Sequence, residues 1–125
     1  AIGADQLFAR ALIDYQLPFT AVIPCQNQDI KWTRKQKQNY KELLRLSTRK
    51  ITLYPEYSPG VFHARNNYMI KHSDICLAVY DGRKSGVTYQ TFKLAIACNL
   101  TVIRFNPLTN KITVIKPVYE QLNLL

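Results

Sequence analysis

The chain has 125 residues, enough for about one domain, and its 47% hydrophobic content excludes a disordered tail. With 4 Gly and 6 Pro it is neither collagen-like nor of low complexity. It carries 17 Lys and Arg against 8 Asp and Glu, and residues 31–50 alone hold eight basic residues and one acid. The net charge of +9 therefore comes mostly from one segment of a chain that is otherwise nearly neutral.

The first half of the chain predicts two helices and two strands. Apolar side chains recur at helical spacing over residues 5–15, and residues 19–24 form a short apolar run typical of a strand. Thr33 predicts the N-cap of a second helix that ends near Leu46, and residues 51–54 predict the next strand.

The second half predicts two more helices and three more strands. The helices are expected at residues 61–72 and 87–98, and the strands at 75–80, 101–105 and 111–115. Apolar stripes predict the helix positions that face inward, which are Phe62 and Met69 with either Arg65 or Asn66, and then Tyr89, Phe92, Ala95 and Ile96.

Strands that alternate with helices indicate βαβ units and a parallel sheet, and near-continuous apolar strands indicate burial on both faces. The expected fold class is therefore α/β, a Rossmann-like three-layer sandwich with a mostly parallel sheet and helices on both faces. We expect a single domain over residues 1–125, with an edge strand and a tail at 111–125. An exposed edge strand at 111–115 also predicts pairing in a homodimer.

Membrane and metal-binding functions are disfavoured by the sequence. No apolar run approaches the ~18 residues of a transmembrane helix and no secretory signal is visible, which predicts a cytoplasmic protein without membrane contact. The cysteine spacings match no zinc pattern, and Cys76 and Cys98 lie in apolar runs that predict buried thiols. Cys25 follows a strand-like run, which leaves its exposure open. His63 and His72 have no partner at metal-ligand spacing.

The turn after the strand at 75–80 is the first candidate site. In open parallel sheets, ligands bind beyond the carboxyl ends of the strands. Here Asp81 follows the strand and a helix begins near Gly86, where N-terminal amides suit a phosphate. Ser85 and Thr88 add hydroxyl donors, although a plain capping turn fits the same spacing.

Arg65 and Asn66 form the second candidate site. An arginine flanked by amides at the start of a helix can grip a phosphate with two hydrogen bonds. The alternative is a surface arginine that contacts solvent or a carboxylate. The 8 acids are scattered, and their spacing defines no general acid–base pair.

These residues also give the chain a resemblance to a known protein group. The matching segments are Ala1-Ile2-Gly3-Ala4-Asp5, Ile23-Pro24 with Asn27-Gln28, Trp32 followed by Tyr40, Tyr57-Ser58-Pro59-Gly60-Val61-Phe62, Arg65-Asn66 with Tyr68-Met69, His72-Ser73-Asp74, and Ala78-Val79-Tyr80-Asp81-Gly82. Over roughly residues 1–107 the chain resembles the SLOG superfamily, the Smf/DprA and LOG-like Rossmannoid group, and most closely its YpsA-like branch.

The resemblance implies a Rossmann-like fold that binds nucleotides or nucleotide-derived ligands at the carboxyl ends of the strands. It adds Gly3 and Asp5 to the pocket, because their segment is similar to the family's Gly-Gly-Ala-x-Gly-x-Asp. Family members normally begin with another strand, so the resemblance also implies that an N-terminal part is missing here. One wall of the pocket is then expected to be absent from this chain.

Two departures from the family pattern concern the chemistry of the site. The family's Gly-Gly-Thr turn reads Ser85-Gly86-Val87-Thr88 here, and the β-branched Val87 can crowd a phosphate. The LOG phosphoribohydrolases carry a catalytic Glu three residues after that Thr, and this position is Thr91. Arg65 matches the arginine of that branch, but an arginine alone binds rather than catalyses.

The leading hypothesis is a nucleotide or nucleotide-derivative binding or sensing module without clear catalytic residues. Its ligand-binding residues are expected to be Gly3, Asp5, Arg65, Asn66, Asp81, Ser85, Gly86 and Thr88. A further alternative is a nucleotide N-glycosidic hydrolase, which needs a carboxylate near Arg65 from Asp5, Glu56 or Asp81. The cofactor is not identified by the sequence.

The other alternative is a single-stranded nucleic-acid-binding protein that uses the basic helix at 33–46. On a helical wheel, Trp32, Tyr40 and Leu43 fall on one side. The opposite side is basic and carries Arg34, Lys37, Lys41 and Arg45. A solvated helix face is the simpler explanation of the same pattern.

Overall fold

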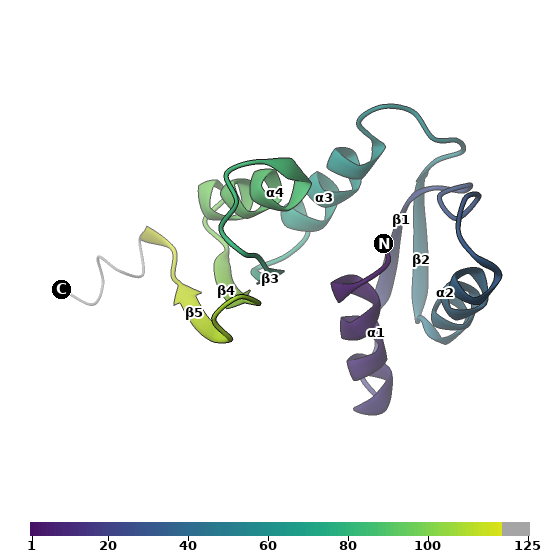
Figure 1. Ribbon diagram of the computed structural model, residues 1–125, viewed down its shortest axis with the longest axis horizontal. Helices are drawn as coiled ribbons and strands as arrows, with labels where there is room; N and C mark the ends of the chain where they lie inside the picture. The colour runs from purple at the N-terminus through teal and green to yellow at the C-terminus, as the bar shows by residue number, and fades with distance from the viewer. Residues whose placement is uncertain (119–125) are drawn as a thin grey trace. The chain divides into compact units, whose positions relative to one another are not determined.

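The computed structural model describes residues 1–118, and in that part the chain forms four helices and five strands in two sheets (Figure 1). The fold class is therefore α/β, as predicted. The chain divides into two compact units, Ala1–Val61 (unit 1) and the chain from Phe62 onward (unit 2). The three-layer sandwich and the single domain stay predictions.

Unit 1 is built on a pair of parallel strands joined through a helix (Figure 1). Its elements are α1 (Ala4–Asp14), β1 (Thr20–Cys25), α2 (Arg34–Leu46) and β2 (Arg49–Tyr54). Val22 of β1 lies opposite Ile51 of β2. The Arg10 guanidinium of α1 forms an ion pair with Glu42 of α2, with Nη1 3.2 Å from Oε1.

Thr33 is the N-cap of α2, as the sequence predicted, and it forms a complete capping box. The Thr33 Oγ1 accepts a hydrogen bond from the Gln36 N–H at 3.2 Å, and Gln36 Oε1 accepts from the Thr33 N–H at 2.9 Å. Two of the amides that a helix start leaves unpaired are thereby satisfied.

Replacing Thr33 with alanine is expected to lower the free energy of unfolding by about 1 kcal/mol, the usual loss of a side-chain N-cap. Trp32 is the chain's single tryptophan, so its fluorescence during urea unfolding reports this region. Ser85→Ala is the matched control, because Ser85 is the N-cap of a helix but makes no side-chain capping bond. Circular dichroism measures the free energy of unfolding of both variants. Equal losses in Thr33→Ala and Ser85→Ala would contradict the capping assignment.

Unit 2 is a mixed three-stranded sheet with two helices. Its elements are α3 (Val61–Lys71), which begins at the last residue of unit 1, β3 (Ile75–Val79), α4 (Gly86–Ala97), β4 (Thr101–Asn106) and β5 (Lys111–Ile115). β3 and β4 are parallel with Leu77 opposite Ile103, and β5 runs antiparallel to β4 with Val114 opposite Ile103. The edge position of β5 is confirmed, whereas a homodimer through it stays a prediction.

The core of unit 2 lies on one face of this sheet. Val102 and Ala95 are completely buried and form a cluster with Ile70 and Leu100. Cys76 of β3 packs against the same cluster from the neighbouring strand. Ile75 and Leu77, which alternate with Cys76 along β3, are more than half exposed. The less exposed residues of this strand are therefore the ones that pack against the cluster.

Two predicted helix stripes are partly wrong. On α3, Phe62 and Met69 are 37% and 42% exposed, and the buried positions are Val61, Arg65 and Ile70. The stripe is thus turned by about one residue, or roughly 100° on a helical wheel. On α4, Ala95 is buried as predicted but Ile96, the next residue, is 39% exposed.

The element bounds agree closely with the prediction elsewhere, except that β2 begins at Arg49, ahead of the predicted start at residue 51. Residues 119–125 of the predicted tail lie outside the described part of the chain. None of the helices within residues 1–118 combines the length and apolar character that a membrane crossing requires.

Candidate functional site

The loop between β3 and α4 is a compact turn held by its own side chains. The Tyr80 N–H donates to the Phe105 carbonyl at 3.0 Å, which anchors the loop to the end of β4. The Asp81 carboxylate accepts from the Arg83 N–H at 3.1 Å and from Arg83 Nε at 2.8 Å. Gly82 has a φ of +93°, a backbone conformation that side chains rarely allow.

The start of α4 is the place where the sequence predicted that a phosphate would bind. Ser85 is the N-cap of α4, as the capping-turn alternative expected, but its side chain makes no capping hydrogen bond. The first amides of a helix have no partner within the helix and carry its positive dipole end. A Cβ built on Gly86 would meet no atom within 4 Å, and Ser85 and Thr88 are exposed, so the first turn of α4 is accessible from solvent.

Arg65 and Asn66 are connected to α4 through a chain of hydrogen bonds. The Arg65 Nε donates to Asn66 Oδ1 at 2.8 Å, and Asn66 Nδ2 donates to Thr91 Oγ1 at 2.9 Å. The Thr91 hydroxyl in turn donates to the Val87 carbonyl at 2.9 Å. We call Arg65, Asn66, Thr91 and Val87 the α3–α4 network. It links the residues predicted on α3 to the first two turns of α4.

Arg65 is not a surface arginine. It is only 6% exposed, and its guanidinium carbon lies 5.7 Å from the centre of the Phe62 ring. A guanidinium stays protonated in proteins, so Arg65 carries a positive charge. The alternative of a solvent-paired surface arginine is therefore wrong, and unit 2 holds a buried positive charge beside α4.

The carboxylate in the loop before α4 belongs to Asp81 and is paired with Arg83. The Arg83 N–H, and then the charge of its guanidinium, lower the pKa of Asp81, so this carboxyl is ionised and paired at neutral pH. Thr91 stands where a catalytic Glu was considered, and its hydroxyl is held in the α3–α4 network. Gly3, Asp5 and Glu56 belong to unit 1, so their part in a site stays a prediction. Within residues 1–118, no cluster of His, Cys, Asp or Glu could hold a metal ion.

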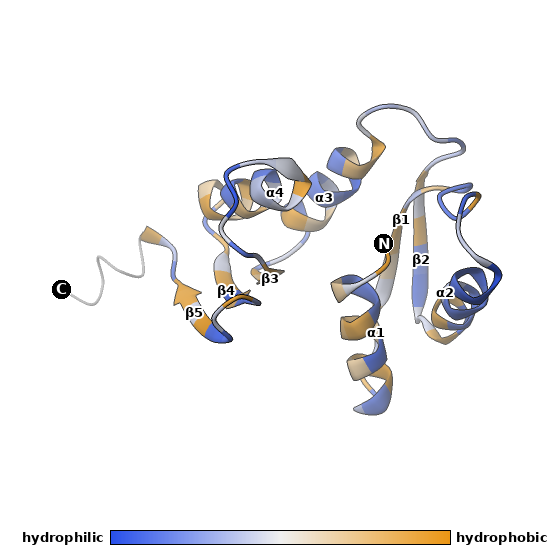
Figure 2. Cartoon of the chain, viewed as in Figure 1, coloured by the Kyte–Doolittle hydropathy of each residue, from blue (hydrophilic) through white to orange (hydrophobic). Residues whose placement is uncertain are grey.

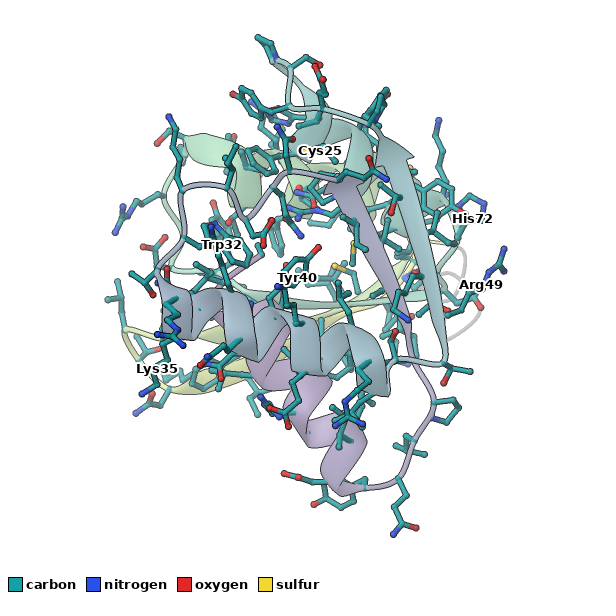
Figure 3. All side chains as sticks on the ribbon, turned by 90° about the vertical axis from the view of Figure 1, so that its right-hand side faces the viewer. Cys25, Trp32, Lys35, Tyr40, Arg49 and His72 are labelled. Atoms are coloured by element: carbon teal, nitrogen blue, oxygen red, sulfur yellow. The ribbon has the colours of Figure 1, made fainter. Side chains whose placement is uncertain are left out.

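The basic helix has the two faces that the sequence predicted. Leu43 is 5% exposed, and the rings of Trp32 and Tyr40 meet edge to face at a centroid distance of 5.2 Å. Figure 3 shows these two rings on one side of α2 and Lys35 on the other. The predicted basic residues Arg34, Lys41 and Arg45 are exposed and Lys37 is half-buried, and α2 is among the most hydrophilic elements in Figure 2.

The prediction of buried thiols is wrong for Cys98 and holds in part for Cys76, which is half-buried. Cys25, at the end of β1, is fully buried, whereas Cys98, which follows the last turn of α4, is exposed. Burial raises the pKa of the Cys25 thiol, although the Asn27 N–H opposes this, and burial also raises the pKa of Cys76. Cys98 is the C-cap of α4 and lies beyond the helix residues that pack against the core.

We therefore expect a thiol reagent such as DTNB to label Cys98 alone within minutes at neutral pH. Cys25 and Cys76 combine burial with a raised pKa, so little thiolate is available to react at either position. In urea, where the protein is unfolded, all 3 thiols should react. Peptide mapping of the labelled protein identifies the site, and rapid labelling of Cys25 would contradict its burial.

Two contributors to this end of the sheet were missed at the sequence level, Tyr80 and Arg104. Arg104 Nε donates to the Tyr80 carbonyl at 3.1 Å, and the guanidinium lies over the Tyr80 ring at 4.8 Å. A signal was available, because Arg104 is the one charged residue in the apolar strand at 101–105. The periodicity places it on the face of Val102, next to the core.

Comparison with known proteins shows the family to which the chain is related. The family model YpsA, described as the YspA SLOG family, matches residues 3–106. The chain is also similar to an uncharacterised SPbeta prophage-derived protein, YoqJ, from Bacillus subtilis (strain 168), with 37% identity over 75 residues that cover 50% of this chain. The match spans 44% of that relative's length, which is less than half of it. The chain therefore belongs to the YpsA family of SLOG proteins.

Proposed function

We propose that the chain is a binding module for a nucleotide or nucleotide-derived ligand, with the ligand's phosphate held at the start of α4. The observation that carries this proposal is the start of α4, where the N-cap Ser85 makes no side-chain capping hydrogen bond and residues 85–88 are exposed. A phosphate there would accept hydrogen bonds from the first amides and the hydroxyls of Ser85 and Thr88. Membership of the SLOG family supports a nucleotide-related role.

The buried charge of Arg65 supports the same location. The α3–α4 network connects this guanidinium to the second turn of α4, so a positively charged group lies in the part of unit 2 where we propose that the phosphate binds. The loop carboxylate of Asp81 is already neutralised by Arg83, which lowers its repulsion of a phosphate. Thr91 supplies no carboxylate, so we propose binding or sensing rather than glycosidic hydrolysis.

Isothermal titration with AMP, ADP-ribose and a cyclic dinucleotide, each beside its unphosphorylated nucleoside, tests the proposal. We expect binding that requires the phosphate and raises the melting temperature. Ser85→Asp is the decisive variant, because a carboxylate at the N-cap caps the helix and occupies the place of the phosphate. It should keep or increase stability and weaken phosphate binding about tenfold or more.

Two results would overturn the proposal. One is the absence of binding for every phosphorylated compound at millimolar concentration. The other is a ligand whose affinity is unchanged by Ser85→Asp, since that ligand would then bind away from α4. Thr33→Asp serves as the control, because it changes the N-cap of α2 by the same chemistry at a helix of unit 1.

A second candidate function, single-stranded nucleic-acid binding, is favoured by the exposed basic face of α2. If phosphates are neutralised there, affinity for single-stranded DNA should fall steeply with salt. The combined change of Lys37, Lys41 and Arg45 to Glu should abolish binding. The control carries the same change of charge at exposed lysines outside α2, namely Lys50, Lys71 and Lys111. An equal loss of DNA affinity in both triple variants would show that the DNA is attracted only non-specifically by the net charge.

A further inference from the structure

Tyr80 is the central residue of the loop that leads to α4. Although it follows β3 immediately, it is 6% exposed, and its ring lies 4.7 Å from the Phe92 ring of α4. Its hydroxyl donates to the Arg83 carbonyl at 2.6 Å, which closes the loop back over the tyrosine. The loop conformation therefore depends on where the Tyr80 ring and backbone are held.

Arg104 holds Tyr80 from the neighbouring strand. Its Nε donates to the Tyr80 carbonyl at 3.1 Å, and its guanidinium stacks over the Tyr80 ring at 4.8 Å and near the Phe92 ring at 5.8 Å. Arg104 takes part in none of the ion pairs found among residues 1–118, whose carboxylates pair with other cations. The half-buried guanidinium thus interacts with an aromatic ring and a loop carbonyl instead of a carboxylate.

Gly82 shows how closely the loop lies on this arginine. A Cβ built on Gly82 would stand 3.2 Å from Arg104 Nη2, tighter than an ordinary contact. Its φ of +93° also disfavours any side chain. Glycine at this position thus allows both the turn and the close approach of the guanidinium.

We propose that Arg104 is a positioning residue that fixes the 81–85 loop, and so sets the entry to the start of α4. We call Arg104, Tyr80, Gly82 and Arg83 the loop latch. The stacking and the hydrogen bond to Tyr80 hold the tyrosine, and the Tyr80 hydroxyl then holds Arg83. The effect on ligand binding rests on the proposed function, but the effect on the loop does not.

Limited trypsin digestion tests the latch without any ligand, because Arg83 and Lys84 are exposed cleavage sites inside the loop. Arg104→Met removes the charge and the donor, and it should speed cleavage after these residues about fivefold or more. Arg104→Lys keeps the charge but not the Nε donor, so its rate of loop cleavage should lie between those of the wild type and Arg104→Met. Cleavage after Lys93, within α4, reports general unfolding and should stay unchanged.

Gly82→Ala should also speed trypsin cleavage in the 81–85 loop, because the added Cβ moves the loop away from the Arg104 guanidinium. Gly60→Ala is its matched control, since Gly60 has nearly the same φ, +92°, but no atom within 4 Å of a Cβ. In the Arg104→Met background, Gly82→Ala should add less than it does in the wild type, because the crowded guanidinium is gone.

The outcomes separate the latch from the proposed function. Unchanged loop cleavage in Arg104→Met, or cleavage after Lys93 that rises equally, overturns the latch whatever the chain binds. Faster loop cleavage together with weaker binding of the phosphorylated ligands supports it. Faster loop cleavage in a chain that binds none of these ligands supports the latch and overturns the proposed function alone.

Discussion

Replacing Asn66 with alanine is expected to lower the free energy of unfolding by about 1–3 kcal/mol, the cost of leaving buried polar partners unpaired. The Asn66 side chain is half-buried, accepts from Arg65 Nε at 2.8 Å and donates to Thr91 Oγ1 at 2.9 Å. The variant removes both bonds at once, and one of them satisfies a guanidinium that is only 6% exposed. Urea unfolding followed by circular dichroism measures the loss.

Asn67→Ala is the matched control, because Asn67 is the exposed neighbouring amide on the same helix. We expect its effect to lie within about 0.5 kcal/mol, as for ordinary surface substitutions. Asn66→Asp keeps an acceptor for Arg65 and can accept from Thr91, so it should retain more stability than Asn66→Ala. A loss in Asn67→Ala as large as in Asn66→Ala would indicate that helix propensity, not the network, is responsible.

A double-mutant cycle with Thr91→Val tests whether the network acts as a unit. Valine keeps the shape of Thr91 but removes its hydroxyl, which bonds both Asn66 and the Val87 carbonyl. A coupling of about 0.5–3 kcal/mol is typical of residues in one hydrogen-bond network. Additive losses would mean that Arg65 is held without α4, and the electrostatic argument for the anion site would weaken.

The secondary structure was largely predictable because local signals agree with the final packing. Thr33 and Gln36 form their capping box from neighbours in sequence, and β5 has the predicted bounds, residues 111–115. The inward faces of α3 and α4 were harder, because apolar residues lie nearly all round these helices. A stripe defined by Phe62 and Met69 differs from the buried one by a single residue, and only contact with the sheet decides between them.

The candidate site was predictable in type but not in partners. Sequence reasoning selected the start of α4 and the Arg65–Asn66 pair, since amides and guanidinium groups suit phosphate. It could not show that Thr91 joins them, because that bond spans 25 residues along the chain. Arg104 was missed for the same reason, as its contacts with Tyr80 depend on the pairing of β3 with β4.

Truncating Val102 to alanine should lower the free energy of unfolding by about 2 kcal/mol or more, from the methyl groups lost and the cavity left. Val102 is completely buried in β4, at the centre of the cluster formed with Ile70, Ala95 and Leu100. Val114→Ala removes the same atoms from β5, where the side chain is 52% exposed and lies on the opposite face of the sheet.

The pair of variants isolates burial, because both replace a strand valine and so lose the same β-propensity. We expect Val114→Ala to cost less than about 0.5 kcal/mol. Comparable losses would mean that the Val114 face is as well packed as the core face. Since β4 also carries Arg104, loosening at Val102 should reach the loop latch, and trypsin cleavage after Arg83 and Lys93 should then rise together, unlike in Arg104→Met.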